Sequence, residues 1–213
     1  MKRSPVRFWQ EARRNDVRVR YRQGDGPFRV SPSAGPHSGA EPQEINVPQP
    51  ASSASLYPAE LTHFLAASGL LAEHELSEVC TDPHPQAAAY SGCSLVLTET
   101  TGKQTRAVFR AAKVTPTKAG LFVTLWIRGT DGQTRPYRAT DGIDVLYVAA
   151  HTADGYGYFR FTAADLLKAK ILAGDASAGK RGFRLYTPWD TSLNRTAQNT
   201  WSWQQHCFTV LAR

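Results

Sequence analysis

The chain has 213 residues, 41% of them hydrophobic, and a formal net charge of +7. No stretch approaches the roughly 18 consecutive apolar residues of a transmembrane helix, and residues 1–30 lack the apolar block of a secretory signal peptide, so a soluble, cytoplasmic protein is expected. The three cysteines, Cys80, Cys93 and Cys207, stand singly, which argues against a disulfide framework and against paired zinc ligands.

The positive charge is concentrated at the amino terminus. Residues 1–30 contain nine Lys or Arg and three acidic residues, whereas the rest of the chain contains 16 basic and 15 acidic residues. Residues 23–55 are rich in Pro, Gly, Ser and Ala and bury too little apolar surface to offset the entropy lost on ordering. We therefore predict a basic, disordered arm and linker over residues 1–55 and one folded domain over residues 56–213. The alternative is that the arm reflects an over-long start of translation.

The folded part is expected to begin with a helix near Ser55 that Gly69 ends. Three apolar residues share one face of this helix: Leu61, Phe64 and Leu65. The acidic segment 70–79 is predicted to continue as a helical turn until Asp82 and Pro83 break the pattern.

Strand periodicity follows. Residues 92–98, 104–114 and 120–128 alternate or are rich in β-branched and aromatic residues, and turn sequences separate them. They predict an antiparallel meander. Residues 143–150 form a short apolar run that is typical of a buried strand.

The last part of the chain contains two further helices and a strand. Thr162 and Asp165 have the spacing of a capping box, which predicts a helix through Lys170 that Gly174 ends. Residues 181–186 predict a strand and residues 194–208 a helix. Together these elements predict an α/β (α+β) fold in which helices flank a mixed central β-sheet.

Motifs of common catalytic sites are missing. Residues 174–180 match the GxxxxGK of a phosphate-binding loop, but Arg181 replaces the Ser or Thr that binds magnesium. The expected order is also helix, loop, strand instead of strand, loop, helix. The six histidines show no HExxH spacing, and no GxSxG occurs. The sequence therefore predicts no catalytic residue, no metal ligand and no cofactor.

Two basic segments suit contacts with phosphate. The first, AKVTPTKAG, presents Lys113 and Lys118 together with the hydroxyls of Thr115 and Thr117; an ordinary solvent-exposed hairpin is the alternative. The second, GKRGFRLYTPWD, interleaves basic and aromatic residues, as in sites that neutralise phosphate and stack bases.

The second segment is expected to be a strand with two different faces. Arg184 and Tyr186 would share one face, and Phe183 and Leu185 the other. The alternative is a core strand anchored by Trp189.

The last predicted helix also has a polar and aromatic face. Gln198, Trp201 and Gln205 share one face, whereas Trp203 and Cys207 share another. The alternative is that this helix caps the sheet and binds nothing.

Three blocks together resemble the MepB family. AKVTPTKAGLFVTLW at residues 112–126 is similar to that family's AKxTPTKxGxFVTxW segment, and residues 179–190 and 197–204 resemble the blocks that follow it, in the same order. The resemblance covers residues 57–213 and implies a restriction-endonuclease-like core that binds nucleic acid, with no enzymatic activity assigned. Thr187 and Asn199 depart from the family pattern, and Asn199 removes one cation.

A nuclease core of that kind needs an Asp on one strand and a Glu-x-Lys on the next to hold magnesium. Neither Lys113 nor Arg128 supplies this motif, because Ala111 and Trp126 stand in the carboxylate position, and a register that starts from Asp144 fails as well. The sequence therefore predicts a core without catalytic activity.

The leading hypothesis is a non-catalytic nucleic-acid-binding protein whose preference for DNA or RNA and oligomeric state stay open. The candidate binding residues are Lys113, Thr115, Thr117, Lys118, Arg128, Lys180, Arg181, Arg184, Trp189, Gln198 and Trp203. One alternative is a metal-dependent nuclease with a rearranged site, built from Glu75, Glu78 or Asp144 with Lys113. The other is a regulatory module that binds a protein partner.

Overall fold

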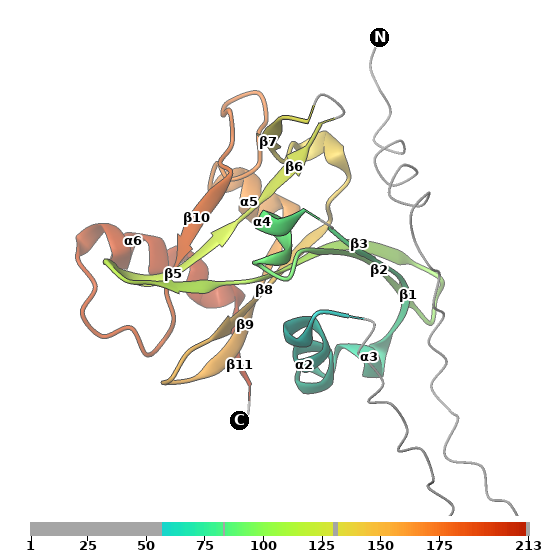
Figure 1. Cartoon of the computed structure of the whole chain (residues 1–213), viewed down its shortest axis with the longest axis horizontal. Coiled ribbons are helices and arrows are strands. Elements are labelled where there is room, and N and C mark those ends of the chain that lie inside the picture. Colours follow the sequence, from blue (N-terminus) through green and yellow to red (C-terminus); the bar gives the residue numbers. More distant parts are fainter. Residues whose placement is uncertain (1–56, 83, 130–131, 212–213) are drawn as a thin grey trace, which may run out of the picture.

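The computed structural model describes residues 57–82, 84–129 and 132–211 (Figure 1). The arm and linker predicted over residues 1–55 lie outside these residues. Within the described part of the chain, no helix is both long and apolar enough to cross a membrane.

The described elements form three sheets and a set of short helices. The helices are α2 (Ala59–Ser68), α3 (Leu70–Glu73), α4 (Pro85–Ala88), α5 (Ala163–Lys168) and α6 (Arg195–Gln204), with 3-10 turns η2 (Ala139–Asp141) and η3 (Gln205–Cys207). The strands are β1 (His74–Thr81), β2 (Cys93–Glu99), β3 (Gln104–Ala111), β4 (Lys113–Thr115), β5 (Lys118–Thr124), β6 (Trp126–Arg128), β7 (Thr134–Pro136), β8 (Val145–His151), β9 (Tyr156–Thr162), β10 (Gly182–Leu185) and β11 (Phe208–Leu211). The sheet orders are β1-β2-β3-β8-β9-β11, β10-β5-β4 and β6-β7.

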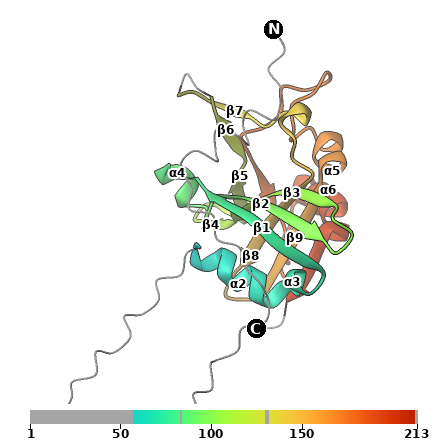
Figure 2. The same cartoon turned by 90° about the vertical axis from the view of Figure 1, so that its right-hand side faces the viewer.

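The central six-stranded sheet is mixed. Neighbouring strands in it are antiparallel except β3 and β8, which run parallel from the pair Ala107 and Val145 to the pair Ala111 and Ala149. Helix α2 covers one face, whereas β5, β10, α5 and α6 lie on the other (Figures 1 and 2). The prediction of a mixed central sheet flanked by helices is confirmed, with a second small sheet as part of one layer.

Strand β8 is buried on both faces of this sheet. Side chains alternate between the two faces of a strand. Val145, Tyr147 and Ala149 belong to the core under α2, and Leu146, Val148 and Ala150 belong to the core under β5 and β10. The buried strand predicted over residues 143–150 is therefore confirmed.

Helix α2 confirms the first predicted helix. Leu61, Phe64 and Leu65 are its buried residues, and burying each side chain contributes about 2 kcal/mol. The helix ends at Gly69, whose φ of 68° lies in the left-handed region that glycine adopts without a steric penalty. The predicted start at Ser55 lies outside the described residues.

The helical prediction for residues 70–79 is wrong over most of its length. Helix α3 is a single turn, and the chain then continues as β1, which pairs with β2 in antiparallel register. Strand β1 lies at the edge of the sheet, and Leu76 is its one fully buried residue. The strand is stabilised by pairing with β2, a contact that the local spacing of apolar residues does not encode.

The predicted meander is correct for two strands and wrong for the third. Strands β2 and β3 are antiparallel neighbours. Residues 120–128, however, divide between β5 and β6, and β8 takes the place beside β3. The chain leaves the central sheet after Ala111 and forms the β4–β5 hairpin of the small sheet.

The carboxyl-terminal third contains two strands that were not predicted, β9 and β11, which extend the central sheet beyond β8. The capping box that opens α5 is confirmed, since the Thr162 hydroxyl accepts from the Asp165 amide and the Asp165 carboxylate accepts from the Thr162 amide. The helix ends at Lys168 because Lys170 has a φ of 56° and Ile171 then turns into the core.

The closing helix is shorter than predicted. Asn194 caps α6 by accepting from the Ala197 amide at 2.9 Å. The helix ends at Gln204, and Phe208 already belongs to β11. The strand predicted over residues 181–186 is confirmed as β10.

Candidate functional site

Strand β10 forms the edge of the small sheet and is the base of the candidate site. Phe183 and Leu185 are buried, whereas Arg184 points to the other side, as the alternation predicts. The Leu125 amide donates to the Arg181 carbonyl, so the peptide groups of alternate residues, including Arg184, face away from β5. Such an edge presents unpaired backbone donors and acceptors.

Gln204 satisfies part of this edge. Its side chain is fully buried, donates from Nε2 to the Arg184 carbonyl at 2.8 Å and accepts at Oε1 from the Tyr186 amide at 3.1 Å. The carboxamide therefore makes the pair of bonds that a neighbouring strand would make. This contact fixes α6 against β10 and sets the position of Arg184.

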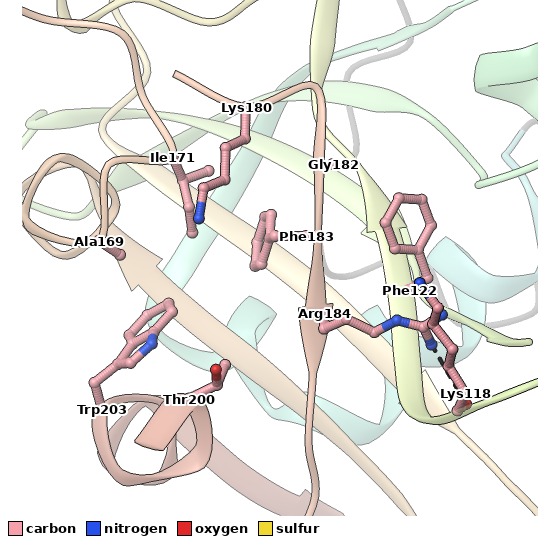
Figure 3. A pocket seen from close by; sticks show the side chains of 10 residues that line it. All are labelled: Lys118, Phe122, Ala169, Ile171, Lys180, Gly182, Phe183, Arg184, Thr200 and Trp203. Carbon is pink, nitrogen blue, oxygen red and sulfur yellow. Dashed lines mark hydrogen bonds between the residues drawn. The ribbon is translucent and has the colours of Figure 1, made fainter. Parts of the chain in front are cut away.

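An open cavity of about 400 Å³ lies along the same edge. Figure 3 shows its wall residues on both sides of β10. They are Lys118, Phe122, Ala169, Ile171, Lys180, Gly182, Phe183, Arg184, Thr200 and Trp203. Lys118, Lys180, Arg184 and Trp203 were predicted as binding residues from the sequence, so the fold brings these four together from β5, the α5–β10 connection, β10 and α6.

Arg184 is held in place by the β4–β5 hairpin. Its guanidinium donates to the Thr115 hydroxyl at 2.7 Å and lies 5.6 Å from the centre of the Phe122 ring. In Figure 3 the side chain extends towards Phe122 and Lys118. The hydroxyl of Thr115 is therefore a partner of Arg184, and its bond orients the cation at the cavity.

Lys180 reaches the other side of β10. In Figure 3 its ammonium group lies between Ile171 and Phe183, on the same side as Trp203. The Lys180 amide donates to the Ile171 carbonyl at 2.9 Å, which fixes the connection between α5 and β10. The GxxxxGK segment thus occurs in the order helix, loop, strand.

Two of the predicted cations lie elsewhere, beside α4. The Lys113 ammonium is 5.0 Å from the centre of the Tyr90 ring. Arg128 lies over Trp126, contacts the His84 imidazole at 2.8 Å and donates to the Gly132 carbonyl. Neither residue lines the cavity, because β4 and β6 carry them to other parts of the surface.

Three other predicted residues do not line the cavity. Arg181 is exposed and donates to the Thr134 hydroxyl at 3.2 Å. Thr117 is exposed in the turn of the β4–β5 hairpin, and Gln198 is exposed on α6 and donates to the Leu193 carbonyl.

Trp189 packs into the fold and does not line the cavity. Its ring contacts Phe208 edge-to-face at 5.5 Å, and a Cβ atom on Gly155 would come within 2.7 Å of it. The Thr187 amide and hydroxyl both donate to the Asp190 carboxylate at 2.7 Å. The PWD part of the block therefore forms a turn that anchors the chain, as the alternative interpretation of Trp189 held.

The carboxylates of the nuclease alternative are not gathered into one site. The Asp144 carboxylate accepts from the Arg106 amide at 2.8 Å, and Glu75 and Glu78 belong to the outer strand β1. In the described part of the chain, two groups of side chains are close enough to share a metal ion, and neither contains any of these three carboxylates. Strands β2 and β3 together carry one carboxylate, Glu99, which pairs with Lys103 at 3.2 Å.

Two buried polar residues received no role from the sequence. Gln204 lies in a block that resembles the family, and the signal that could have identified it is an amide on the apolar side of an amphipathic helix.

Arg110 is 4% exposed on β3, and its guanidinium donates to the Phe109 carbonyl at 2.8 Å. Burial raises the pKa of Tyr137, while the nearby positive charge of Arg110 acts in the opposite direction. Arg110 therefore belongs to the interior and is not a phosphate ligand.

Comparisons with known proteins found a matching family model and a similar solved structure. The family model described as MepB-like matches residues 84–210, a range that contains every candidate binding residue. A solved structure, the crystal structure of MepB, is similar with a TM-score of 0.57 and 29% sequence identity, covering 73% of this chain and 97% of that chain. No curated protein matches the chain.

Proposed function

The chain belongs to the MepB-like family, and we propose that it binds nucleic acid through backbone phosphates without cleaving the strand. The observation that carries this proposal is that Lys118, Lys180 and Arg184 line one cavity, with Lys180 on one side of β10 and the other two on the opposite side (Figure 3). These cations come from different segments of the chain, and salt bridges, which would reduce their positive charge, are absent for all of them within the described residues.

The wall of the cavity suits a phosphate with an adjoining base. Ammonium and guanidinium groups neutralise phosphate oxygens, and backbone amides add directed hydrogen bonds. The Arg184 amide, which faces away from β5, is one such donor on this edge. Phe122 and Trp203 supply aromatic faces in the same cavity, and stacking of a base on such a ring is tolerant of sequence. The proposed interface therefore favours backbone contacts over base-specific ones.

The proposal includes a degenerate nuclease-like core. Support comes from the topology, in which α2 precedes the antiparallel strands β1, β2 and β3, and β8 lies parallel to β3. The connection from β3 to β8 runs through β4–β7 and the turn η2, where such a core would have a helix. The lack of a carboxylate on β3 supports binding without magnesium-dependent cleavage. A cytoplasmic location is part of the same proposal.

The test is a titration of the full chain with labelled duplex and single-stranded DNA and RNA at several salt concentrations, with and without magnesium. The variant Lys118→Gln/Lys180→Gln removes two cavity cations, and Lys103→Gln/Arg106→Gln removes two exposed cations from the β2–β3 turn region. Each phosphate contact contributes about −0.9 to the slope of log K against log salt on duplex DNA. We expect the cavity pair to reduce the slope by about 1.8 and the control pair to leave it unchanged.

The recovered nucleic acid is then run on a gel. Intact strands with salt-sensitive binding support the proposal, whereas magnesium-dependent cleavage would favour the nuclease alternative. Equal effects of the two variant pairs would show that only diffuse positive charge matters. Absence of binding would leave the protein-partner alternative.

A further inference from the structure

A cluster of metal-ligand side chains lies where α2 meets the β8–β9 hairpin. Glu60 and His63 are three residues apart on α2 and therefore share a face. His151 is the last residue of β8. The ligand atoms of these three residues all lie within 4.8 Å of one another, and His151 Nδ1 is 3.8 Å from Glu60 Oε1.

Tyr156 forms the inner wall of this cluster. It pairs with His151 across the hairpin, and its ring stacks on the His63 ring with 4.4 Å between the centres and 12° between the planes. The His151 ring centre is 5.1 Å from that of Tyr156. Both imidazoles are therefore positioned by the same aromatic ring.

Two buried polar atoms of the cluster have no hydrogen-bond partner among the described residues, the Tyr156 hydroxyl and Glu60 Oε2. Tyr156 is 2% exposed. Buried polar groups are nearly always paired in folded proteins, so two orphans in one cluster indicate a partner outside the described residues.

We propose that Glu60, His63 and His151 bind one divalent transition-metal ion, Zn²⁺, with the Tyr156 hydroxyl next to the coordination sphere. Two imidazoles and one carboxylate are a known donor set for zinc, and they leave a fourth position for water. Nitrogen ligands favour such an ion over Mg²⁺ or Ca²⁺, which prefer oxygen ligands. The Tyr156 hydroxyl would hydrogen-bond to the bound water or to the ligating carboxylate, as outer groups around metal ligands do.

The second group with metal-ligand spacing, Asp165, His206 and Cys207, is a weaker candidate. The Asp165 carboxylate already accepts the amide and hydroxyl of Thr162 in the capping box. Burial raises the pKa of the Cys207 thiol to about 11, with Asp165 acting in the same direction, so the thiolate that would bind a metal is disfavoured. This group therefore serves as the internal control.

The proposed metal site is independent of the proposed nucleic-acid interface. Tyr156 belongs to the core under α2, whereas the cavity residue Phe183 belongs to the core on the other face of the central sheet. Loss of one site leaves the other testable.

The test uses the full chain, stripped with a chelator and titrated with Zn²⁺ by calorimetry and with Co²⁺ by visible absorption. We expect one equivalent to bind, without the absorption band of a cobalt–thiolate bond. His63→Ala and His151→Ala should each weaken binding by at least about 100-fold, because each removes one of three ligands. Tyr156→Phe keeps the ring and should weaken binding by about 10-fold.

His206→Ala is the matched control, since it removes an exposed histidine from the other group. It should bind Zn²⁺ as the wild type does. His63 and His151 are exposed, so their variants should fold, and a melting curve without metal checks this. Added Zn²⁺ should raise the melting temperature of the wild type and of His206→Ala, but not that of His63→Ala or His151→Ala. Failure of the wild type to bind Zn²⁺ or Co²⁺, binding that survives both histidine substitutions, or loss of binding in His206→Ala would overturn the proposal.

Discussion

The buried carboxamide of Gln204 should be one of the largest single polar contributions to stability outside the cores. We consider the change Gln204→Met, which keeps the side-chain volume close to the original and removes the hydrogen bonds to the Arg184 carbonyl and the Tyr186 amide. Each group left without a partner costs about 1–3 kcal/mol. Because there are two such groups, we expect the free energy of unfolding to fall by about 3 kcal/mol.

The assay is urea unfolding followed by tryptophan fluorescence, with a thermal melt as a second measurement. A loss of about 3 kcal/mol corresponds to a fall in Tm of roughly 6–12 °C for a domain of this size. Gln205→Met is the matched control, because Gln205 is the exposed neighbour of Gln204 and should change the stability by less than about 0.5 kcal/mol. A Gln204→Met protein within about 1 kcal/mol of the wild type would refute the argument that the carboxamide stands in for a neighbouring strand.

Four further changes test other parts of the structure. Gly120→Ala should lower the free energy of unfolding in urea by more than Gly102→Ala does. Both glycines have positive φ, but a Cβ at Gly120 would overlap the Leu185 carbonyl and the Tyr186 ring, whereas nothing lies within 4 Å of a Cβ at Gly102. Equal losses would show that the close approach at Gly120 is unimportant. Burial raises the pKa of Cys93 to about 12 and that of Cys207 to about 11. A thiol reagent at pH 8 should therefore modify the native protein at Cys80 first. Rapid labelling of a second thiol without unfolding would contradict this. Burial raises the pKa of Asp165, but the hydrogen bonds from Thr162 and the nearby His206 and Arg160 outweigh burial and leave that pKa below its usual value. The stability that this carboxylate contributes is therefore present above the usual Asp range and is lost as the pH falls through the lower pKa of the folded state. Asp165→Asn should flatten that part of a curve of stability against pH. Deleting residues 1–55 should weaken nucleic-acid binding without changing the melting transition, and collapse of the remaining domain would contradict the predicted boundary.

The elements that the sequence predicted well are those whose burial is visible locally. Helix α2 has apolar residues at helical spacing and a glycine at its end, and β8 is an unbroken apolar run. In both cases one contiguous segment contains the whole signal. Strand β9 was not predicted, although Tyr156–Thr162 has a local strand signal of the same kind, since it is rich in aromatic residues.

The elements that the sequence predicted wrongly depend on partners far along the chain. Strand β1 is acidic and half-exposed, and it is a strand because β2 is available to pair with it. The segment from Gln104 to Val114 has one continuous strand pattern, yet the chain turns out of the central sheet after Ala111. That turn separates Lys113 from the cavity that Lys118 lines, although the two lysines are close in sequence.

The candidate site was accessible to sequence reasoning only in part. The cations and Trp203 were visible as residue types, whereas their convergence depends on how β5, β10 and α6 pack together. The cluster of Glu60, His63 and His151 shows the same limit. The spacing of Glu60 and His63 on a helix can be seen in the sequence, but His151 joins them only when the β8–β9 hairpin lies against α2.

The parallel pairing of β3 with β8 has a consequence for the order in which the chain folds. The β2–β3 and β8–β9 hairpins each close over a short turn, and such local contacts form quickly. Joining them side by side requires the whole segment from residue 112 to residue 144 to close as a loop, and non-local pairings of this kind set the rate of folding. Strand β10 then completes a sheet whose other two strands lie within that loop. We therefore expect the edge that carries Arg184 to assemble late, after β3 and β8 have paired.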